Sequence, residues 1–238
     1  MVSTSREPER ISGMFDRIAH RYDRLNHLLS AGLDRRWRAR AVQELHLRQT
    51  DEVVDMCTGT ADLAIEAVTA ATGQARGVVG VDFAGEMLRL GLVKVRGLGL
   101  DQRVHLVRGD ATRVPLPDQR FDAAMVAFGI RNVQDPEAAT REFARLLRPG
   151  GRLAVLEFGF PKIPGIRAAY RWYFKYLLPR VGRLISKHNE AYSYLPASVE
   201  QFPAPEAFAA MLQKHGFATV RTVPLTFGIV YLYIATRA

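Results

Sequence analysis

A regular alternation of short apolar runs with amphipathic helical patterns, which begins near residue 51, constrains the fold more than any other feature of the chain. Apolar strands separated by helices pair in parallel, and the connecting helices then cover both faces of the sheet. The pattern predicts helices at 61–72, 85–97 and 135–147, the last of which ends at the helix-breaking sequence RPGG. It predicts strands at 52–57, 77–82, 103–108, 121–127 and 152–158.

The two ends of the chain depart from this alternation. Residues 14–46 have apolar side chains at spacings of three and four, which predicts a helical cap before the first strand. A basic, aromatic stretch at 160–200 interrupts the pattern as a late insertion. A helix near 205–215 and two strands, about 218–225 and 228–235, then close the chain. The short link LTFG predicts that these last two strands are antiparallel.

We therefore expect an α/β fold in one domain over residues 1–238, with a Rossmann-like, mainly parallel, doubly wound sheet of seven strands and an antiparallel last strand. A chain of 238 residues that is 48% hydrophobic can bury one substantial core. No window approaches the ~20 consecutive apolar residues of a membrane span, and the N-terminal residues lack a signal-peptide pattern. The single cysteine, Cys57, excludes an internal disulfide, so we expect a cytoplasmic protein.

The turn after the first predicted strand is the first candidate ligand site, because doubly wound sheets bind ligands at the carboxyl ends of their strands. A dinucleotide fingerprint would place glycines at 57, 59 and 62, but only Gly59 is present and residue 62 is an aspartate. A pyrophosphate needs close backbone approach and is repelled by a carboxylate. The loop Asp55-x-Cys57-x-Gly59-x-Ala61 instead resembles the acid-x-G-x-G-x-G turn that binds S-adenosylmethionine, a sulfonium cation without phosphate.

The next two strand ends carry matching groups. Asp82 follows Gly59 by 23 residues, where a carboxylate can accept the ribose hydroxyls. At the third strand end, Asp110 is expected to meet the adenine amino group, and the small Ala111 leaves room for the ring. Thr60 offers a hydroxyl or a backbone contact at the start of the following helix. These strand ends predict that the chain binds S-adenosylmethionine through Asp55, Gly59, Thr60, Asp82, Asp110 and Ala111.

Several acceptor chemistries are disfavoured by residues that are absent or misplaced. The only cysteine lies inside the cofactor loop, which argues against a cysteine nucleophile that methylates a pyrimidine carbon. No Pro-Pro pair occurs, so the [DN]-P-P-[YF] signature of amine methylation on nucleobases is missing. The six histidines form no metal-ligand pattern, and we expect no metal.

Four further blocks carry a family resemblance: MFDRIAHRYDRLNHLLSAGLDRRWR, VDFAGEML, FGIRNVQDPEAATREFARLLRPGGRLAVLEF and EAYSYLPASVEQFP. In this order they resemble the quinone-biosynthesis C-methyltransferases of the UbiE/MenG family, which are class I S-adenosylmethionine-dependent enzymes. The resemblance runs from about residue 14 to the end and implies methyl transfer to a ring carbon of a polyprenylated hydroquinone. The loop CTGTAD is more similar to members that convert demethylmenaquinol to menaquinol than to those that also make ubiquinone.

The resemblance also implies roles for particular residues. Arg131 and Asn132 match a pair that lies close to the acceptor in the family, where an always-protonated arginine would stabilise the phenolate and the asparagine would orient a hydroxyl. Tyr22 and Asp23 match a pair in the helical cap and would close over the cofactor, although Tyr22 also falls on the apolar helix face. Tyr192 and Tyr194 would line the acceptor pocket or pack in the core.

The charge and the late insertion point to a partner. The net charge of +9 suggests nucleic acid, a membrane surface or an acidic substrate, and a solvated basic surface explains it equally well. Residues 158–189 hold seven lysines and arginines, no acid and many aromatics, which predicts peripheral contact with an anionic membrane, unless the aromatics pack inward. We expect a polyprenyl naphthoquinol substrate and no nucleic-acid partner. The alternatives are a ubiquinone-pathway benzoquinol C-methyltransferase, an RNA methyltransferase and a non-catalytic cofactor-binding protein, and a homo-oligomer stays open.

Overall fold

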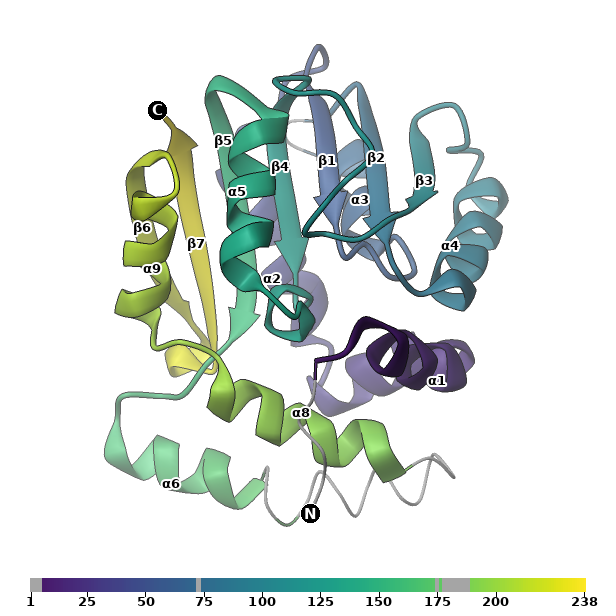
Figure 1. The fold of residues 1–238 in the computed structure, drawn as a ribbon. Helices are drawn as coiled ribbons and strands as arrows, with labels where there is room; N and C mark the ends of the chain where they lie inside the picture. The colour runs from purple at the N-terminus through teal and green to yellow at the C-terminus, as the bar shows by residue number, and fades with distance from the viewer. Residues whose placement is uncertain (1–5, 72–73, 174–175, 177–188) are drawn as a thin grey trace.

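The computed structural model describes residues 6–71, 74–173, 176 and 189–238. Its centre is a seven-stranded sheet with the order β3-β2-β1-β4-β5-β7-β6, in which β7 is antiparallel to both of its neighbours and the other strands run parallel (Figure 1). The predicted fold class and the antiparallel end of the sheet are therefore confirmed. The strands are β1 Glu52–Met56, β2 Gly77–Asp82, β3 Val104–Arg108, β4 Phe121–Ala127, β5 Leu147–Phe158, β6 Phe217–Leu225 and β7 Val230–Arg237.

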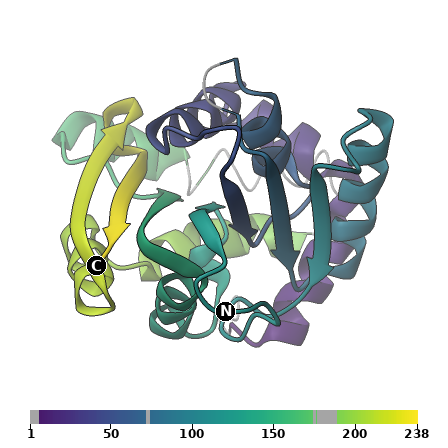
Figure 2. The same cartoon turned by 90° about the horizontal axis from the view of Figure 1, so that it is seen from above.

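Helices lie on both sides of the sheet (Figure 2). One face is covered by buried side chains of α2 (Leu33–Glu44) and α3 (Asp62–Thr69), with Trp37 among them. The other face packs against α5 (Pro136–Leu146) and α9 (Pro205–Lys214), which contribute Phe143 and Phe208. Helix α4 (Gly85–Gly97) packs beside β3 at the edge of the sheet. Two apolar cores on opposite faces make the fold doubly wound, as predicted.

The N-terminal cap differs from the prediction, because the continuous helical pattern over 14–46 is broken. Helix α1 spans Pro8–Leu29 and α2 begins only at Leu33. Between them Ala31 and Gly32 adopt left-handed φ values of +50° and +76°, and the Gly32 amide donates a hydrogen bond to the carbonyl of His27. A glycine in this conformation ends a helix at little steric cost. The turn lets α2 pack on the sheet while α1 crosses beyond its strand ends.

The late insertion lies on the same end of the molecule as α1. Helices α6 (Pro164–Trp172) and α8 (Asn189–Gln201) lie beyond the carboxyl ends of the parallel strands (Figure 1), and α8 contacts α1. The turn η3 (Thr226–Gly228), which connects β6 to β7, lies at this end too. Helices α1, α6 and α8 therefore enclose the edge of the sheet at which ligands of such folds bind. Within the described residues, no helix is both long and apolar enough to cross a membrane.

Candidate functional site

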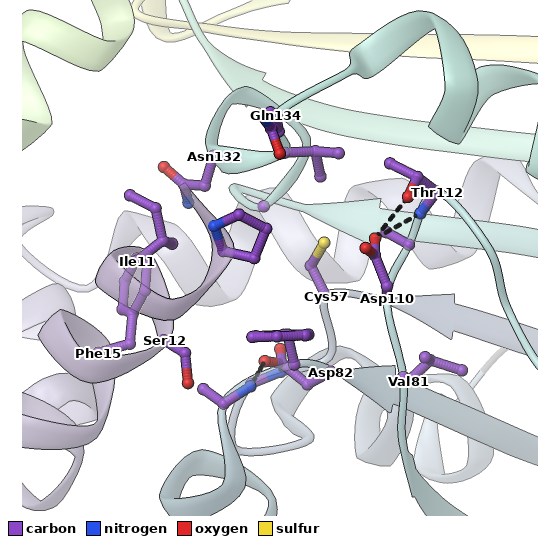
Figure 3. A pocket seen from close by; sticks show the side chains of 18 of the residues that line it. Ile11, Ser12, Phe15, Cys57, Val81, Asp82, Asp110, Thr112, Asn132 and Gln134 are labelled. Carbon is purple, nitrogen blue, oxygen red and sulfur yellow. Dashed lines mark hydrogen bonds between the residues drawn. The ribbon is translucent and has the colours of Figure 1, made fainter. Parts of the chain in front are cut away.

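A first cavity lies over the carboxyl ends of β1, β2, β3 and β4, beneath α1, and has a volume of about 410 Å³ (Figure 3). This volume lies within the range of small-molecule sites. Most of the residues predicted to bind a cofactor line this cavity, and they come from four separate parts of the chain. These cofactor residues are Tyr22, Gly59, Asp82, Asp110 and Ala111. Asn132, predicted to orient the acceptor, lines this cavity as well.

The loop between β1 and α3 forms the floor of this cavity. Cys57, Gly59 and Ala61 all have left-handed φ values, between +55° and +67°, so the chain turns sharply at alternate residues. Asp55 lies beneath the loop, where its carboxylate accepts a hydrogen bond of 2.5 Å from the Thr58 hydroxyl. It does not line the cavity. The geometry therefore gives Asp55 a supporting position rather than a direct ligand contact.

Burial raises the pKa of Asp55 to about 7, with the nearby carboxylate of Asp82 acting in the same direction. A carboxyl whose pKa is raised on folding holds a proton that the unfolded chain releases above about pH 4. The free energy of unfolding is therefore expected to fall as pH rises from about 4 through 7. Melting temperatures of the wild type and of Asp55→Asn between pH 5 and pH 8 test this, with a shallower fall expected for the variant. Parallel curves would show that Asp55 does not titrate in this range.

Asp82 closes the same loop from the end of β2. Its carboxylate accepts hydrogen bonds of 2.8 Å from the amides of Gly59 and Ala84, while burial raises its pKa. Asp110 holds the next turn, because one of its oxygens accepts hydrogen bonds of 2.8 Å from both the amide and the hydroxyl of Thr112 (Figure 3). A carboxylate has about four lone-pair sites. Both groups therefore keep acceptor capacity for a ligand in the cavity.

Thr60 lies outside the cavity lining and ties α1 to the loop instead. Its hydroxyl donates to Asp23 at 2.7 Å, and the ammonium of Lys94 in α4 bonds to Asp23 at 2.8 Å and to Asp62 at 2.5 Å. These contacts join α1, the loop, α3 and α4 at one point. Sequence reasoning identified Thr60 and Asp23 separately, and the structure shows them as partners in the same contact.

The second cavity, of about 420 Å³, is enclosed by α1, α2, the insertion and the turn after β6. Tyr194, one of the two tyrosines considered for an acceptor pocket, lies in its wall, whereas the side chain of Tyr192 lies outside the described residues. The lining is mostly apolar and rich in aromatic side chains: Phe15, Tyr22, Trp37, Phe128, Phe158, Tyr170, Tyr173 and Tyr194.

The two cavities share a wall made by Phe15, Tyr22 and Phe128. Burial raises the pKa of Tyr22, so its phenol stays protonated at neutral pH and can donate a hydrogen bond. The position of Tyr22 between the cavities explains why its sequence pattern suggested both a cofactor contact and core packing. It packs on Phe15, with ring centroids 5.8 Å apart, and also faces both spaces.

Arg131 lines the second cavity and is part of a buried network. Its guanidinium forms an ion pair of 2.8 Å with Glu157, donates to the carbonyl of Phe128 and donates to the Ser198 hydroxyl at 3.3 Å. Burial raises the pKa of Glu157, and the positive charge of Arg131 opposes that rise. Sequence reasoning missed Glu157 and Ser198. The signal for Glu157 was an acid inside the apolar run of β5, which is unusual unless the acid is paired.

Arg131 and Asn132 are neighbours in sequence but serve different cavities. Asn132 lines the first cavity, and its amide nitrogen lies 3.4 Å from the Phe128 carbonyl. Its side-chain oxygen is buried and has no hydrogen-bond partner among the residues that the structure describes. A buried acceptor of this kind normally has a partner. Asn132 is therefore suited to accept a hydrogen bond from a ligand in the first cavity.

Gly129 brings the turn η1 (Ile130–Asn132) directly against the loop after β1. A Cβ atom at residue 129 would lie 2.3 Å from the Cβ of Cys57, closer than two such atoms approach in folded proteins. The close approach places Arg131 and Asn132 beside the loop that carries Gly59.

A profile of the ubiE/COQ5 methyltransferase family matches residues 3–237. The chain belongs to this family. The enzyme "Ubiquinone/menaquinone biosynthesis C-methyltransferase UbiE" of Syntrophotalea carbinolica is 48% identical over 225 residues, which cover 94% of this chain and 93% of that protein. The demethylmenaquinone methyltransferase of Thermus thermophilus is 47% identical over 224 residues, with 94% and 100% covered. The resemblance of the four sequence blocks is thus confirmed.

Solved structures of more distant proteins support the fold of this ubiE/COQ5 family member. An S-adenosylmethionine-dependent methyltransferase of Aquifex aeolicus aligns with a TM-score of 0.63 at 18% identity, covering 98% of this chain and 99% of that one. A Thermotoga maritima protein described as an S-adenosylmethionine-dependent methyltransferase aligns with a TM-score of 0.65 at 19% identity, covering 96% and 100%. At these identities the likeness concerns the fold alone.

Proposed function

We propose that this ubiE/COQ5 family member transfers a methyl group from S-adenosylmethionine to a ring carbon of a polyprenylated hydroquinone, with demethylmenaquinol as its acceptor. One observation carries the proposal: a cavity lined by carboxylates and a cavity lined by aromatics meet at a shared wall of three side chains. A methyl transferase needs both reactants side by side, aligned and shielded from water.

The first cavity fits the methyl donor. S-adenosylmethionine supplies an electrophilic methyl group on a sulfonium cation. Asp82 and Asp110 place negative charge in the cavity, and Gly59 lets the loop approach closely without forming a phosphate cradle. The unpartnered oxygen of Asn132 adds an acceptor for a donor N–H or O–H group. Asp82 would accept the ribose hydroxyls, Asp110 would accept the adenine amino group and Ala111 would leave room for the ring.

The second cavity fits the acceptor ring. Its aromatic lining can stack on a naphthoquinol. The charged residues in the lining are Asp34, Arg38 and Arg131, and we assign to the buried Arg131 the role of holding an acceptor oxygen as a phenolate. Glu157 and Ser198 fix the orientation of that guanidinium. The phenol of Tyr22, at the shared wall, can donate to the same oxygen. The phenolate-activated ring carbon would bond to the methyl carbon as the S–CH3 bond breaks, and the electron pair of that bond would stay on sulfur in the departing S-adenosylhomocysteine. The ring proton would then pass to water as the ring becomes aromatic again, so the step needs no metal and no covalent enzyme intermediate.

The choice of demethylmenaquinol rests on named relatives and on the loop sequence CTGTAD. The Thermus thermophilus relative and a Bacteroides fragilis relative, 39% identical over 232 residues, both bear the name demethylmenaquinone methyltransferase. Other relatives, such as that of Syntrophotalea carbinolica, carry a name that includes ubiquinone. A benzoquinol acceptor is therefore the second candidate.

The test is a direct assay with labelled S-adenosylmethionine. The protein is incubated with a reduced demethylmenaquinone analogue, with a reduced demethylated ubiquinone precursor and with RNA. We expect label in the naphthoquinol product at the highest kcat/KM. A higher kcat/KM for the benzoquinol would make the ubiquinone precursor the acceptor. Label in RNA would overturn the quinol proposal. The absence of label in every reaction would favour a non-catalytic binding protein.

The variant Asp82→Ala tests the donor site. Loss of a charge-assisted acceptor costs about 1.5–3 kcal/mol, so the affinity for S-adenosylmethionine should fall roughly tenfold to a hundredfold. Isothermal titration calorimetry measures the affinity, and circular dichroism checks the fold, because Asp82 also accepts from Gly59 and Ala84. Unchanged affinity would remove Asp82 from the site.

A further inference from the structure

Large apolar side chains are exposed around the second cavity. Leu28 at the end of α1 is 60% exposed, Trp172 at the end of α6 is 58% exposed and Phe227 in η3 is 68% exposed. Ile163, which directly precedes α6, and Tyr176, four residues after its last residue, are exposed as well. We call these five residues the apolar rim. An exposed apolar cluster of this kind marks an interaction surface more often than an isolated exposed residue does.

The rim residues adjoin residues that line the second cavity. Leu28 precedes the lining residue Leu29, and Phe227 follows the lining residue Thr226. Ile163 and Trp172 bracket the stretch of α6 that supplies Ile166, Ala169 and Tyr170 to the lining.

Contacts between these segments place them side by side. The Tyr173 hydroxyl donates to the Leu29 carbonyl at 3.1 Å, which joins the end of α6 to the end of α1. The Trp37 indole donates to the Thr226 hydroxyl at 2.8 Å, which joins α2 to η3. The rim therefore borders one aromatic cavity at the end of the molecule where α1 and α6 lie (Figure 1).

The charged side chains around the rim are mostly basic, although the exposed Glu206 forms an ion pair of 2.5 Å with Lys162 beside Ile163. Exposed arginines lie on α1, on α6 and on the neighbouring α2: Arg24, Arg35, Arg36, Arg167 and Arg171. Asp34 is the only acid between residues 24 and 40, and it is buried, where it bonds to His27 and Arg38. Helix α6 contains no acid. A cationic border around exposed aromatics complements an anionic lipid surface.

We propose that the apolar rim docks the enzyme on an anionic lipid bilayer, so that the acceptor ring passes from the membrane into the second cavity while its polyprenyl tail stays in lipid. The identity of the cavity's occupant rests on the proposed function, whereas the docking does not. The proposal extends the sequence-based prediction, which concerned residues 158–189 alone, to α1 and η3. Within that segment Tyr170 is buried and packs inward, and Phe174, Lys175, Leu177, Leu178 and Arg180 lie outside the described residues.

Vesicle co-sedimentation tests the docking without any quinol. The rim variant is Leu28→Ser/Trp172→Ser/Phe227→Ser, and none of its positions lines either cavity. The matched control is Val93→Ser/Leu98→Ser, because these residues are 61% and 57% exposed at α4, away from both cavity linings. Vesicles of phosphatidylglycerol and phosphatidylcholine should bind the wild type and the control to a similar extent. The amount of the rim variant that sediments with the vesicles should be at least about tenfold lower. High salt should weaken the binding.

Equal binding of the rim variant and the control would overturn the proposal. A second outcome would also overturn the proposal: the wild type does not bind vesicles but forms a dimer, and the rim variant does not dimerise. In that case a second copy of the chain, and not a membrane, would cover the apolar rim. Sedimentation equilibrium measures that outcome.

An activity comparison separates failure of the docking from failure of the proposed function. Each protein is assayed with a tail-less, soluble demethylmenaquinol analogue and with a polyprenylated acceptor embedded in the same vesicles. The rim variant should keep wild-type turnover on the soluble acceptor and lose at least about tenfold on the embedded one. Equal loss on both acceptors would refute docking as the cause. A wild type inactive on both would refute the proposed function and leave the vesicle result standing.

Discussion

Replacing Arg131 by alanine is expected to lower turnover by about 100-fold or more, because an electrostatic group aimed at developing charge contributes on that scale. The affinity for S-adenosylmethionine should stay near that of the wild type, since Arg131 lines the second cavity and not the first. Steady-state kinetics on the demethylmenaquinol analogue and calorimetry with the donor measure the two quantities separately.

The ion pair with Glu157 requires a control, because Arg131→Ala leaves a buried carboxylate without its partner. Breaking a buried ion pair in this way costs about 3–5 kcal/mol of stability. The double variant Arg131→Ala/Glu157→Gln removes the uncompensated charge and should recover most of the melting temperature while turnover stays low. Recovery of turnover together with stability would mean that Arg131 only supports the fold.

Gly129→Ala is expected to abolish donor binding or to prevent folding, because its new Cβ would lie 2.3 Å from the Cβ of Cys57. Neither atom can move away by a side-chain rotation, so the loop after β1 and the turn η1 must separate. Overpacking of a close contact costs at least 1–3 kcal/mol as an order of magnitude. Calorimetry should show a loss of affinity for S-adenosylmethionine of about 100-fold or more, accompanied by a lower melting temperature.

A second substitution makes the steric argument testable. Cys57→Gly removes the Cβ that the alanine would strike, and residue 57 already has a left-handed φ of +55°, which glycine adopts without strain. The double variant Cys57→Gly/Gly129→Ala should therefore regain most of the donor affinity. If the double variant binds no better than Gly129→Ala, another contact of residue 129 must account for the loss.

The strand ends of the donor site could be predicted from sequence because they depend on local patterns. Apolar runs bounded by turns defined β1, β2 and β3, and parallel pairing then brought Gly59, Asp82 and Asp110 to one edge. The same reasoning placed Arg131 in the loop after β4, because the family blocks and the end of the strand coincide there. Local periodicity and strand topology are thus sufficient to find the first cavity.

Contacts that depend on tertiary packing could not be predicted in this way. The partner of Arg131 is Glu157 on the neighbouring strand, and the partner of Thr60 is Asp23 on a helix 37 residues earlier. No spacing rule connects either pair. The break in the predicted helix over 14–46 could not be predicted either, because the apolar spacing continues across Gly32 to Trp37. The left-handed backbone of Gly32 nevertheless changes the direction of the chain there.

Some residues line both cavities and others line only the second, so substitutions in the two groups are expected to have different effects on binding. Phe15, Tyr22 and Phe128 line both cavities, so under the proposed function a substitution there is expected to alter donor and acceptor binding together. Tyr194 and Leu195 in the insertion face only the second cavity. If the cavities hold the donor and the acceptor as proposed, a change confined to the insertion would alter acceptor preference and leave the lining of the first cavity intact. Under the proposed function, we expect that replacing the insertion would change which ring the second cavity accepts, while the lining of the first cavity would stay as it is.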